Sequence, residues 1–213
     1  MNWIDNSVVR ALSRICDLVI LNILWIICSL PIITIGASTS AMYSVMLKIV
    51  KNEEGYIARG FFRGFKDNFR KATILWGTIL VVGVIVGVDL RVIRAMPSTL
   101  QSVFRGVLIF VGFMMICLNI YGFAMIARYE NKLKETIKNA FILTIMKLPY
   151  TILMIVITIA PIILTFLSAR LLVIGMIFWL VIGVALVAWA NSFILRKVFL
   201  IFHDEVEKNE CEN

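Results

Sequence analysis

The chain has 213 residues, of which 61% are hydrophobic and 16% are charged, and its net charge is +8. Soluble domains are about 45–50% hydrophobic and about 25% charged, so this composition excludes an ordinary soluble protein. The polar stretches are too short for a separate catalytic domain. We expect an all-α fold: a polytopic membrane helical bundle of about five transmembrane helices plus amphipathic interfacial helices.

Residues 1–16 predict an interfacial helix. Apolar residues recur at helical spacing from Ile4 to Ile15, while Arg10 and Arg14 occupy other faces. A helix of this kind lies in the membrane surface and does not cross the bilayer. We expect no cleavable signal peptide, because the first residues lack a short basic region followed by an apolar core.

The longest uncharged run lies between Asp17 and Lys48 and contains 30 residues. A straight helix of that length would reach about 45 Å, well beyond a hydrocarbon core of about 30 Å. Pro31 and Gly36 therefore predict a kinked first membrane segment over residues 17–50, with one helix on each side of the kink. This segment either crosses the membrane once or forms a re-entrant hairpin, and the sequence leaves both alternatives open.

Small residues mark two predicted helix-packing sites. Gly36, Ser40 and Ser44 recur at every fourth position after Pro31, and Gly83 and Gly87 form a GxxxG pair. Small residues at this spacing let two helix backbones approach closely inside a bilayer. In the first set, the alternative is that the small residues merely tolerate the kink.

Two blocks of residues carry a family resemblance. The first block is Asn22, Leu24, Trp25, Cys28, Ser29, Leu30, Pro31, Thr34, Ile35, Gly36, Ala37, Ala41, Met42 and Tyr43, and the second is Arg59, Gly60, Phe61, Phe62, Phe65, Lys66, Asn68 and Phe69. Together they resemble the signature of the YesL family of bacterial integral membrane proteins, a domain of unknown function. Members of that family commonly lie beside genes for carbohydrate-import ABC transporters. The resemblance therefore implies an accessory role in sugar uptake and brings no known activity.

Residues 51–71 predict a basic amphipathic cytoplasmic helix, with four cations on one face and four phenylalanines on another. The cations are Arg59, Arg63, Lys66 and Arg70, and the phenylalanines are Phe61, Phe62, Phe65 and Phe69. The cations suit either anionic lipid or an acidic protein partner. The phenylalanines suit either packing on neighbouring helices or contact with that partner.

Two helical hairpins follow, at residues 72–127 and 148–195, and a cytoplasmic helix at residues 128–147 joins them. Residues 196–213 form a hydrophilic tail.

Lys and Arg residues are distributed unequally over this scheme. Residues 48–71, residues 128–147 and the tail contain 15 of the 21 cations. By the positive-inside rule these parts, including the C-terminus, are cytoplasmic, and the protein is a multi-pass protein of the cytoplasmic (inner) membrane. The N-terminus lies outside if residues 17–50 cross once, and inside if they form a hairpin.

Titratable groups do not gather at one depth in the predicted spans, so we expect no catalytic residue, no cofactor and no metal site. The four cysteines are far apart in the sequence. We also expect no nucleic-acid partner. The polar residues of interest are Asn22, Asn119 and Asn191, which lie in three different spans. They either hydrogen-bond across the bundle or line a polar cavity for a small solute.

The stretch from Glu130 to Pro149 resembles in outline the loop by which ABC-importer permeases dock on their ATPase subunits. Glu130 and the ending Met146, Lys147, Leu148 and Pro149 match, but larger residues replace the small ones of that pattern. The alternative is that Pro149 simply begins a helix, where its missing N–H costs little.

These patterns favour a non-enzymatic accessory or assembly protein of carbohydrate (ABC-type) transport, with permease or ATPase subunits and anionic lipid as partners. The alternative is a small-solute carrier or channel formed by the chain itself, as a homo-oligomer, with Asn119 and Asn191 near its pathway.

Overall fold

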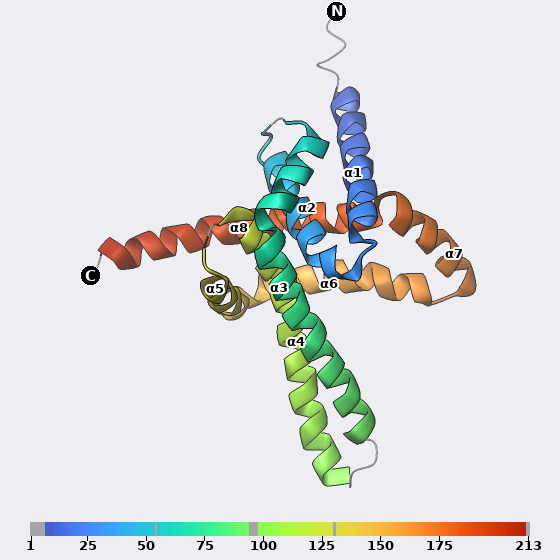
Figure 1. Cartoon of the computed structure of the whole chain (residues 1–213), viewed down its shortest axis with the longest axis vertical. Helices are drawn as coiled ribbons and strands as arrows, with labels where there is room; N and C mark the ends of the chain where they lie inside the picture. Colours follow the sequence, from blue (N-terminus) through green and yellow to red (C-terminus); the bar gives the residue numbers. More distant parts are fainter. Residues whose placement is uncertain (1–6, 54, 94–97, 130, 212–213) are drawn as a thin grey trace, which may run out of the picture.

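The computed structural model describes residues 7–53, 55–93, 98–129 and 131–211 (Figure 1). These residues form helices joined by short turns, and they contain no β-strand. Six helical segments of the described chain are long and apolar enough to cross a membrane. The fold is therefore the expected all-α polytopic membrane bundle. It has one span more than the five we counted, because residues 17–50 supply two.

Residues 17–50 lie in an antiparallel hairpin. Helix α1 (Ser7–Ser29) and helix α2 (Ile35–Val50) are joined by the short 3-10 helix η2 (Ile32–Thr34). Pro31 precedes η2 with an extended backbone, φ −75° and ψ 120°, and so ends the first helix. The predicted pair of helices on either side of a kink at Pro31 is thus confirmed.

Two contacts fix the direction of this hairpin. Near its closed end, Nε1 of Trp25 donates to Oγ1 of Thr39 at 3.1 Å. At its open end, the guanidinium of Arg14 donates to the side-chain carbonyl of Asn52. The beginning of α1 and the turn after α2 therefore lie at the same end of the molecule, as the hairpin alternative requires (Figure 1). These contacts support the hairpin alternative over a single crossing by residues 17–50.

The predicted boundary between an interfacial helix at residues 1–16 and a membrane helix is not a break in the structure. Helix α1 runs without interruption from Ser7 to Ser29. No proline or glycine lies in this helix to end it near Asp17. The part of the predicted interfacial helix at residues 1–6 lies outside the described residues.

Helix α2 lies against the first half of helix α3 (Ile57–Val92), and small residues line the contact. A Cβ atom at Gly36 would lie 2.5 Å from the carbonyl oxygen of Ala72 and 2.6 Å from Cβ of Trp76. Further along, Gly64 of α3 fits against Ser44. Because a side chain at Gly36 would collide with backbone, glycine there sets the distance between the two helices.

Helix α3 is one helix of 36 residues, so the expected boundary at residues 71 and 72 is not a break either. Its second half runs beside the first half of helix α4 (Ser98–Arg128), and the two project together from the rest of the molecule (Figure 1). Gly83 and Gly87 lie in this projection, and a Cβ atom at either would meet nothing within 4 Å. The GxxxG pair therefore packs against no helix within the described residues.

Helix α5 (Leu133–Met146) occupies the expected linker region and ends at Lys147, whose backbone leaves the helical range. Helix α6 (Leu148–Phe166) begins there, with proline in its first turn. Glu130, the first residue of the resemblance to the permease docking loop, lies outside the described residues.

The C-terminal hairpin contains an irregular turn of helix. Helix α7 (Ala169–Phe178) leads through the π-helix η4 (Trp179–Gly183) into helix α8 (Val184–Cys211). Helix α8 continues past residue 195, so the start of the expected tail is helical. Figure 1 shows α6 and α8 running across the direction of α3 and α4. Arg196 connects α8 to α2 by donating to the carbonyl oxygen of Val50 at 2.9 Å.

The core lies where α2 meets α3, α4 and α8, and it includes the fully buried residues Met46, Phe61, Tyr121 and Phe199. The Tyr121 hydroxyl and Oγ1 of Thr151 are 2.9 Å apart, which connects α4 to α6. Apolar side chains cover the outside of α1, α6, α7 and the α3–α4 projection. In a bilayer such surfaces face lipid tails or other helices.

Candidate functional site

The first half of α3 carries a basic face, which we define as Arg59, Arg63, Lys66 and Arg70. All four side chains are exposed, as the helical spacing predicts. Arg63 lies 3.7 Å from Asp67 in an exposed ion pair one turn along the helix. Arg59 lies over the ring of Tyr56, with 5.5 Å between the guanidinium carbon and the ring centroid. These contacts are local to α3, so the cations remain available to a surface outside the chain.

The four phenylalanines do not share one environment. Phe61 is fully buried and Phe65 is half-buried, whereas Phe62 and Phe69 are 52% and 40% exposed. The ring centroids of Phe61 and Phe65 lie 6.3 Å apart, and those of Phe65 and Phe69 lie 5.5 Å apart. Phe61 therefore holds α3 in the core, while Phe62 and Phe69 are left at the surface.

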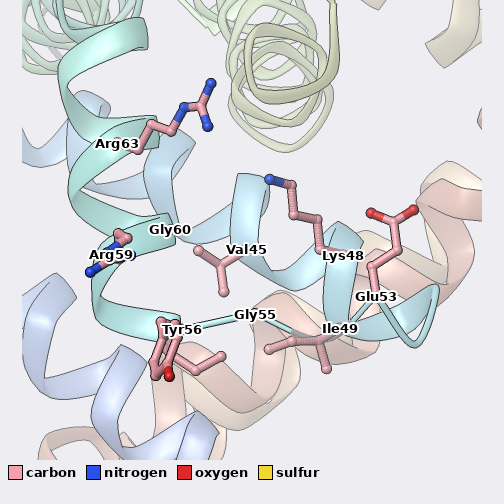
Figure 2. Close-up of a pocket in the computed structure, with 10 residues that line it drawn as sticks. Val45, Lys48, Ile49, Glu53, Gly55, Tyr56, Arg59, Gly60 and Arg63 are labelled. Carbon is pink, nitrogen blue, oxygen red and sulfur yellow. The ribbon is translucent and has the colours of Figure 1, made fainter.

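Beside the basic face lies a groove between the end of α2 and the start of α3, with a volume of about 290 Å³. Figure 2 shows Lys48 and Arg63 extending their charged ends into the same space. Arg59 also lines the groove, but its charged end points away from those of Lys48 and Arg63. Glu53 also lines the groove, but its carboxylate pairs with Lys51 at 3.6 Å. We call this surface the basic groove; its floor is formed by Val45, Ile49 and Gly60.

A second hollow continues from Lys48 and Arg63 toward the end of α4, where it reaches Asp67, Arg128 and Tyr129. The guanidinium of Arg128 lies 5.4 Å from the ring centroid of Tyr129 and 5.1 Å from that of Phe199. Burial raises the pKa of Tyr129, while Arg128 acts in the opposite direction. Three cations from three helices thus surround this hollow, with Asp67 as the one acid among the residues that line it.

The three asparagines have two different environments. Asn22 is fully buried in α1 and bonds the backbone of the irregular turn, donating to the carbonyl oxygens of Trp179 and Leu180 at 3.1 and 2.8 Å. Its side-chain oxygen accepts from the N–H of Ala185 at 3.0 Å. In a π-helix the backbone bonds span five residues instead of four, and Asn22 bonds three backbone groups in and next to this irregular turn. Asn22 is therefore not part of a polar cavity, which corrects that alternative for this residue.

Asn119 and Asn191 do line a common cavity, as the alternative interpretation predicts. It is a half-open hollow of about 310 Å³, and residues of α1, α2, α3, α4, α6, η4 and α8 line it. We call it the amide cavity. Its other polar or aromatic lining residues are Trp25, Thr39, Tyr43, Trp76, Phe123, Thr158 and Trp179, and none of the lining residues is charged.

The tryptophans were not among the predicted site residues. Trp25, Trp76 and Trp179 lie in separate helices, and only the hairpin packing brings them together. The sequence shows only that each lies in an apolar span, and only Trp76 has a small residue, Gly77, next to it. Within the described residues, His, Cys, Asp and Glu side chains form no group of three that could hold a metal ion.

Comparison with known proteins shows which proteins this chain is similar to. The family described as "Protein of unknown function, DUF624" matches residues 18–90. "Uncharacterized protein YteU" of Bacillus subtilis is 26% identical over 164 residues, which cover 73% of each chain. "Uncharacterized protein YesL" of the same bacterium is 27% identical over 158 residues, or 70% of this chain and 74% of that protein. No solved structure matches.

The match to residues 18–90 includes most of the α1–α2 hairpin and the basic face of α3, but neither Asn119 nor Asn191. The two relatives extend the similarity over most of the chain. The resemblance to the YesL family is therefore confirmed, and the family model of DUF624 matches residues 18–90.

Proposed function

We propose that this protein is a non-enzymatic accessory or assembly subunit of the cytoplasmic membrane, associated with ABC-type carbohydrate import. The basic groove and the basic face are its docking surface for an acidic segment of a permease or ATPase subunit. The observation that carries the docking proposal is that Lys48 and Arg63 extend into one groove. The carbohydrate part rests on the family resemblance.

An acidic peptide fits this surface for two reasons. The guanidinium of Arg63 presents a planar fork that binds a carboxylate through two hydrogen bonds. Its present partner, Asp67, is an exposed neighbour, and an exposed pair of this kind contributes less than about 1 kcal/mol and is easily exchanged. By the positive-inside rule, Lys48 and Arg63 lie on the cytoplasmic side of the membrane in this proposal, together with the C-terminus and the loops at the same end of the molecule.

Co-purification tests this proposal. Tagged protein is isolated from its native membrane in mild detergent, and bound permease or ATPase subunits are identified by mass spectrometry. Recovery should fall when Lys48 and Arg63 are both changed to Gln. The control is Arg91→Gln, which removes an exposed cation from the other end of α3. Equal recovery from all three proteins would contradict docking at the basic groove.

The amide cavity favours a second candidate function, in which the chain itself binds and carries a small solute. Ligand sites in proteins are concave, mostly apolar and supplied with a few convergent polar groups, and this cavity has those properties. Uptake of a solute by liposomes that contain only the purified protein would support this candidate. Absence of uptake under conditions where the protein co-purifies with a permease would support the first.

A further inference from the structure

The hydrogen bonds around Asn191 show which atom of its amide lacks a partner. The hydroxyl of Thr158 donates its one proton to the carbonyl oxygen of Met154 at 2.8 Å. The hydroxyl oxygen of Thr158 lies 3.0 Å from Nδ2 of Asn191, and because its proton is already used, it must accept from the amide nitrogen. The side-chain oxygen of Asn191 is then a buried acceptor to which no described residue makes a hydrogen bond of good geometry. The side chain of Tyr43, which also lines the cavity, interacts with this amide. Asn191 is 1% exposed and lines the amide cavity.

Unlike the Asn191 side chain, the tryptophans of the cavity have their polar groups fully hydrogen-bonded. Trp76 donates its Nε1–H to the carbonyl oxygen of Ile32 at 2.8 Å. Trp25 and Trp179 donate theirs to hydroxyl oxygens at 3.1 and 3.0 Å. All three indole N–H groups are thus used within the chain. The rings can offer a ligand only their apolar surfaces, and they are held rigidly in place.

These properties restrict what the cavity can hold. The lining carries no charge that would pair with an ion. A lipid tail would fill the apolar part but has no proton to donate to Asn191. A buried acceptor without a donor destabilises a protein, whereas a ligand hydroxyl at that place would remove the penalty. The volume of about 310 Å³ lies at the small end of ligand sites.

We propose that the amide cavity binds an uncharged molecule of monosaccharide size, with hydroxyl groups that donate to Asn191 and an apolar ring face that lies on the tryptophans. This inference names the ligand class of the second candidate function. Transport of the ligand rests on that candidate function, whereas binding of the ligand does not. Binding and transport are measured separately, so that either can fail alone.

The test uses the full chain in nanodiscs of phosphatidylethanolamine and phosphatidylglycerol, so that no sugar-based detergent is present. D-Glucose, D-galactose and D-xylose are the probes, and equilibrium dialysis of labelled sugar measures binding. Three of the five tryptophans line the cavity, so their fluorescence is a second readout. We expect saturable binding of at least one sugar, and weaker binding of tetrahydropyran, which has the same ring without hydroxyls.

Asn191→Leu should weaken sugar binding about tenfold, as expected for a lost buried hydrogen bond, and should leave thermal stability unchanged or raised. Asn119→Leu, at a half-buried lining position, is the second variant if the first does not fold. Trp189→Phe is the control, because Trp189 lies in α8 outside the cavity lining.

Three results would overturn the proposal. They are absence of saturable binding for all three sugars, equal sugar affinity in the Asn191→Leu protein, and tetrahydropyran binding as tight as that of the sugars. The last would identify an apolar occupant such as a lipid tail. If sugar binds but liposomes show no uptake, the site stands and the carrier function falls.

Discussion

The side-chain amide of Asn22 in α1 donates to the carbonyl oxygen of Trp179, the first residue of the π-helix, at 3.1 Å. The Asn22 side chain also bonds the backbone of Leu180 and Ala185, so one buried residue holds both ends of the irregular turn. Trp179 in turn forms part of the amide cavity. Asn22 therefore holds a wall of the cavity without lining it.

Asn22→Leu should destabilise the protein, because three backbone groups would lose their buried partner. A buried polar group left without a hydrogen bond costs about 1–3 kcal/mol, so the melting temperature in detergent should fall clearly. The matched change Asn191→Leu removes one donor to Thr158, whose hydroxyl keeps its bond to Met154, and should not lower it. If both variants melt like the wild type, Asn22 does not support the π-helix.

The α2–α3 contact makes a prediction about glycine. Gly36→Ala should destabilise the protein by about 1–3 kcal/mol, because the new methyl group would collide with backbone of α3. Ser40→Leu, at a fully buried position of α2, should have a similar effect.

The control for this contact is Gly83→Ala in the α3–α4 projection, where the methyl group meets open space. Alanine favours helix over glycine by about 0.5–1 kcal/mol, so the melting temperature should stay constant or rise. Loss of stability at Gly83 with none at Gly36 would reverse our assignment of the two sites.

Arg196 supplies a third prediction, because it bonds the carbonyl oxygen at the last residue of α2. A cation there also interacts favourably with the helix dipole. Arg196→Gln should lower the free energy of unfolding by about 1 kcal/mol, while Lys197→Gln at the exposed neighbouring position should not. Chemical unfolding in detergent measures both, and equal values would mean that the bond does not stabilise the detergent-solubilised protein.

The sequence predicts most of the helices of this fold, but neither its sixth span nor its π-helix. Apolar runs, the kink at Pro31 and the split of cations from phenylalanines on α3 all follow from local composition and helical period. Boundaries at residues 16, 71 and 195 were placed where polarity changes. Polarity changes do not end a helix unless a proline, glycine or capping residue does, and α1, α3 and α8 continue through them.

The environments of the site residues depend on tertiary packing, which the sequence pattern does not reveal. Asn22 and Asn191 are alike as sequence features, since both are single amides in apolar spans. Their different roles arise because the antiparallel hairpin sets Asn22 against an irregular turn and because α8 sets Asn191 beside Thr158. Both arrangements are tertiary and could not be predicted from spacing along one helix.

The hairpin of α1 and α2 changes the expected topology. In a chain whose native cysteines are replaced by alanine, a cysteine at Ser13 should be labelled from the same side as one at Lys66 or Lys134, and from the opposite side to one at Ser98. The structure supports this because Arg14 lies beside Asn52. Membrane-impermeant maleimide on intact cells measures the labelling. Labelling of Ser13 together with Ser98 would restore a single crossing by residues 17–50.

The basic face gives the last prediction, because lipid and protein partners respond differently to the same change. If Arg59, Arg63, Lys66 and Arg70 contact only anionic lipid, each contributes about 1 kcal/mol of non-directional attraction. Arg→Lys should then be silent, and loss of membrane binding on Arg→Gln should increase with the number of charges removed. A docked carboxylate requires the planar fork, so Arg63→Lys should weaken co-purification while keeping the charge.

Phe62→Ala and Phe65→Ala sharpen the comparison. Phe65 is half-buried beside Phe61, so its loss should lower the melting temperature whichever partner is bound. Phe62 is 52% exposed, so its loss should leave stability nearly unchanged and should reduce co-purification only if this side of α3 is the interface. Because Phe62→Ala is expected to fold normally, its effect on co-purification is a direct measure of docking. If Arg63→Lys and Phe62→Ala both retain the partner, then the basic face is a lipid anchor and the docking surface lies elsewhere on the chain.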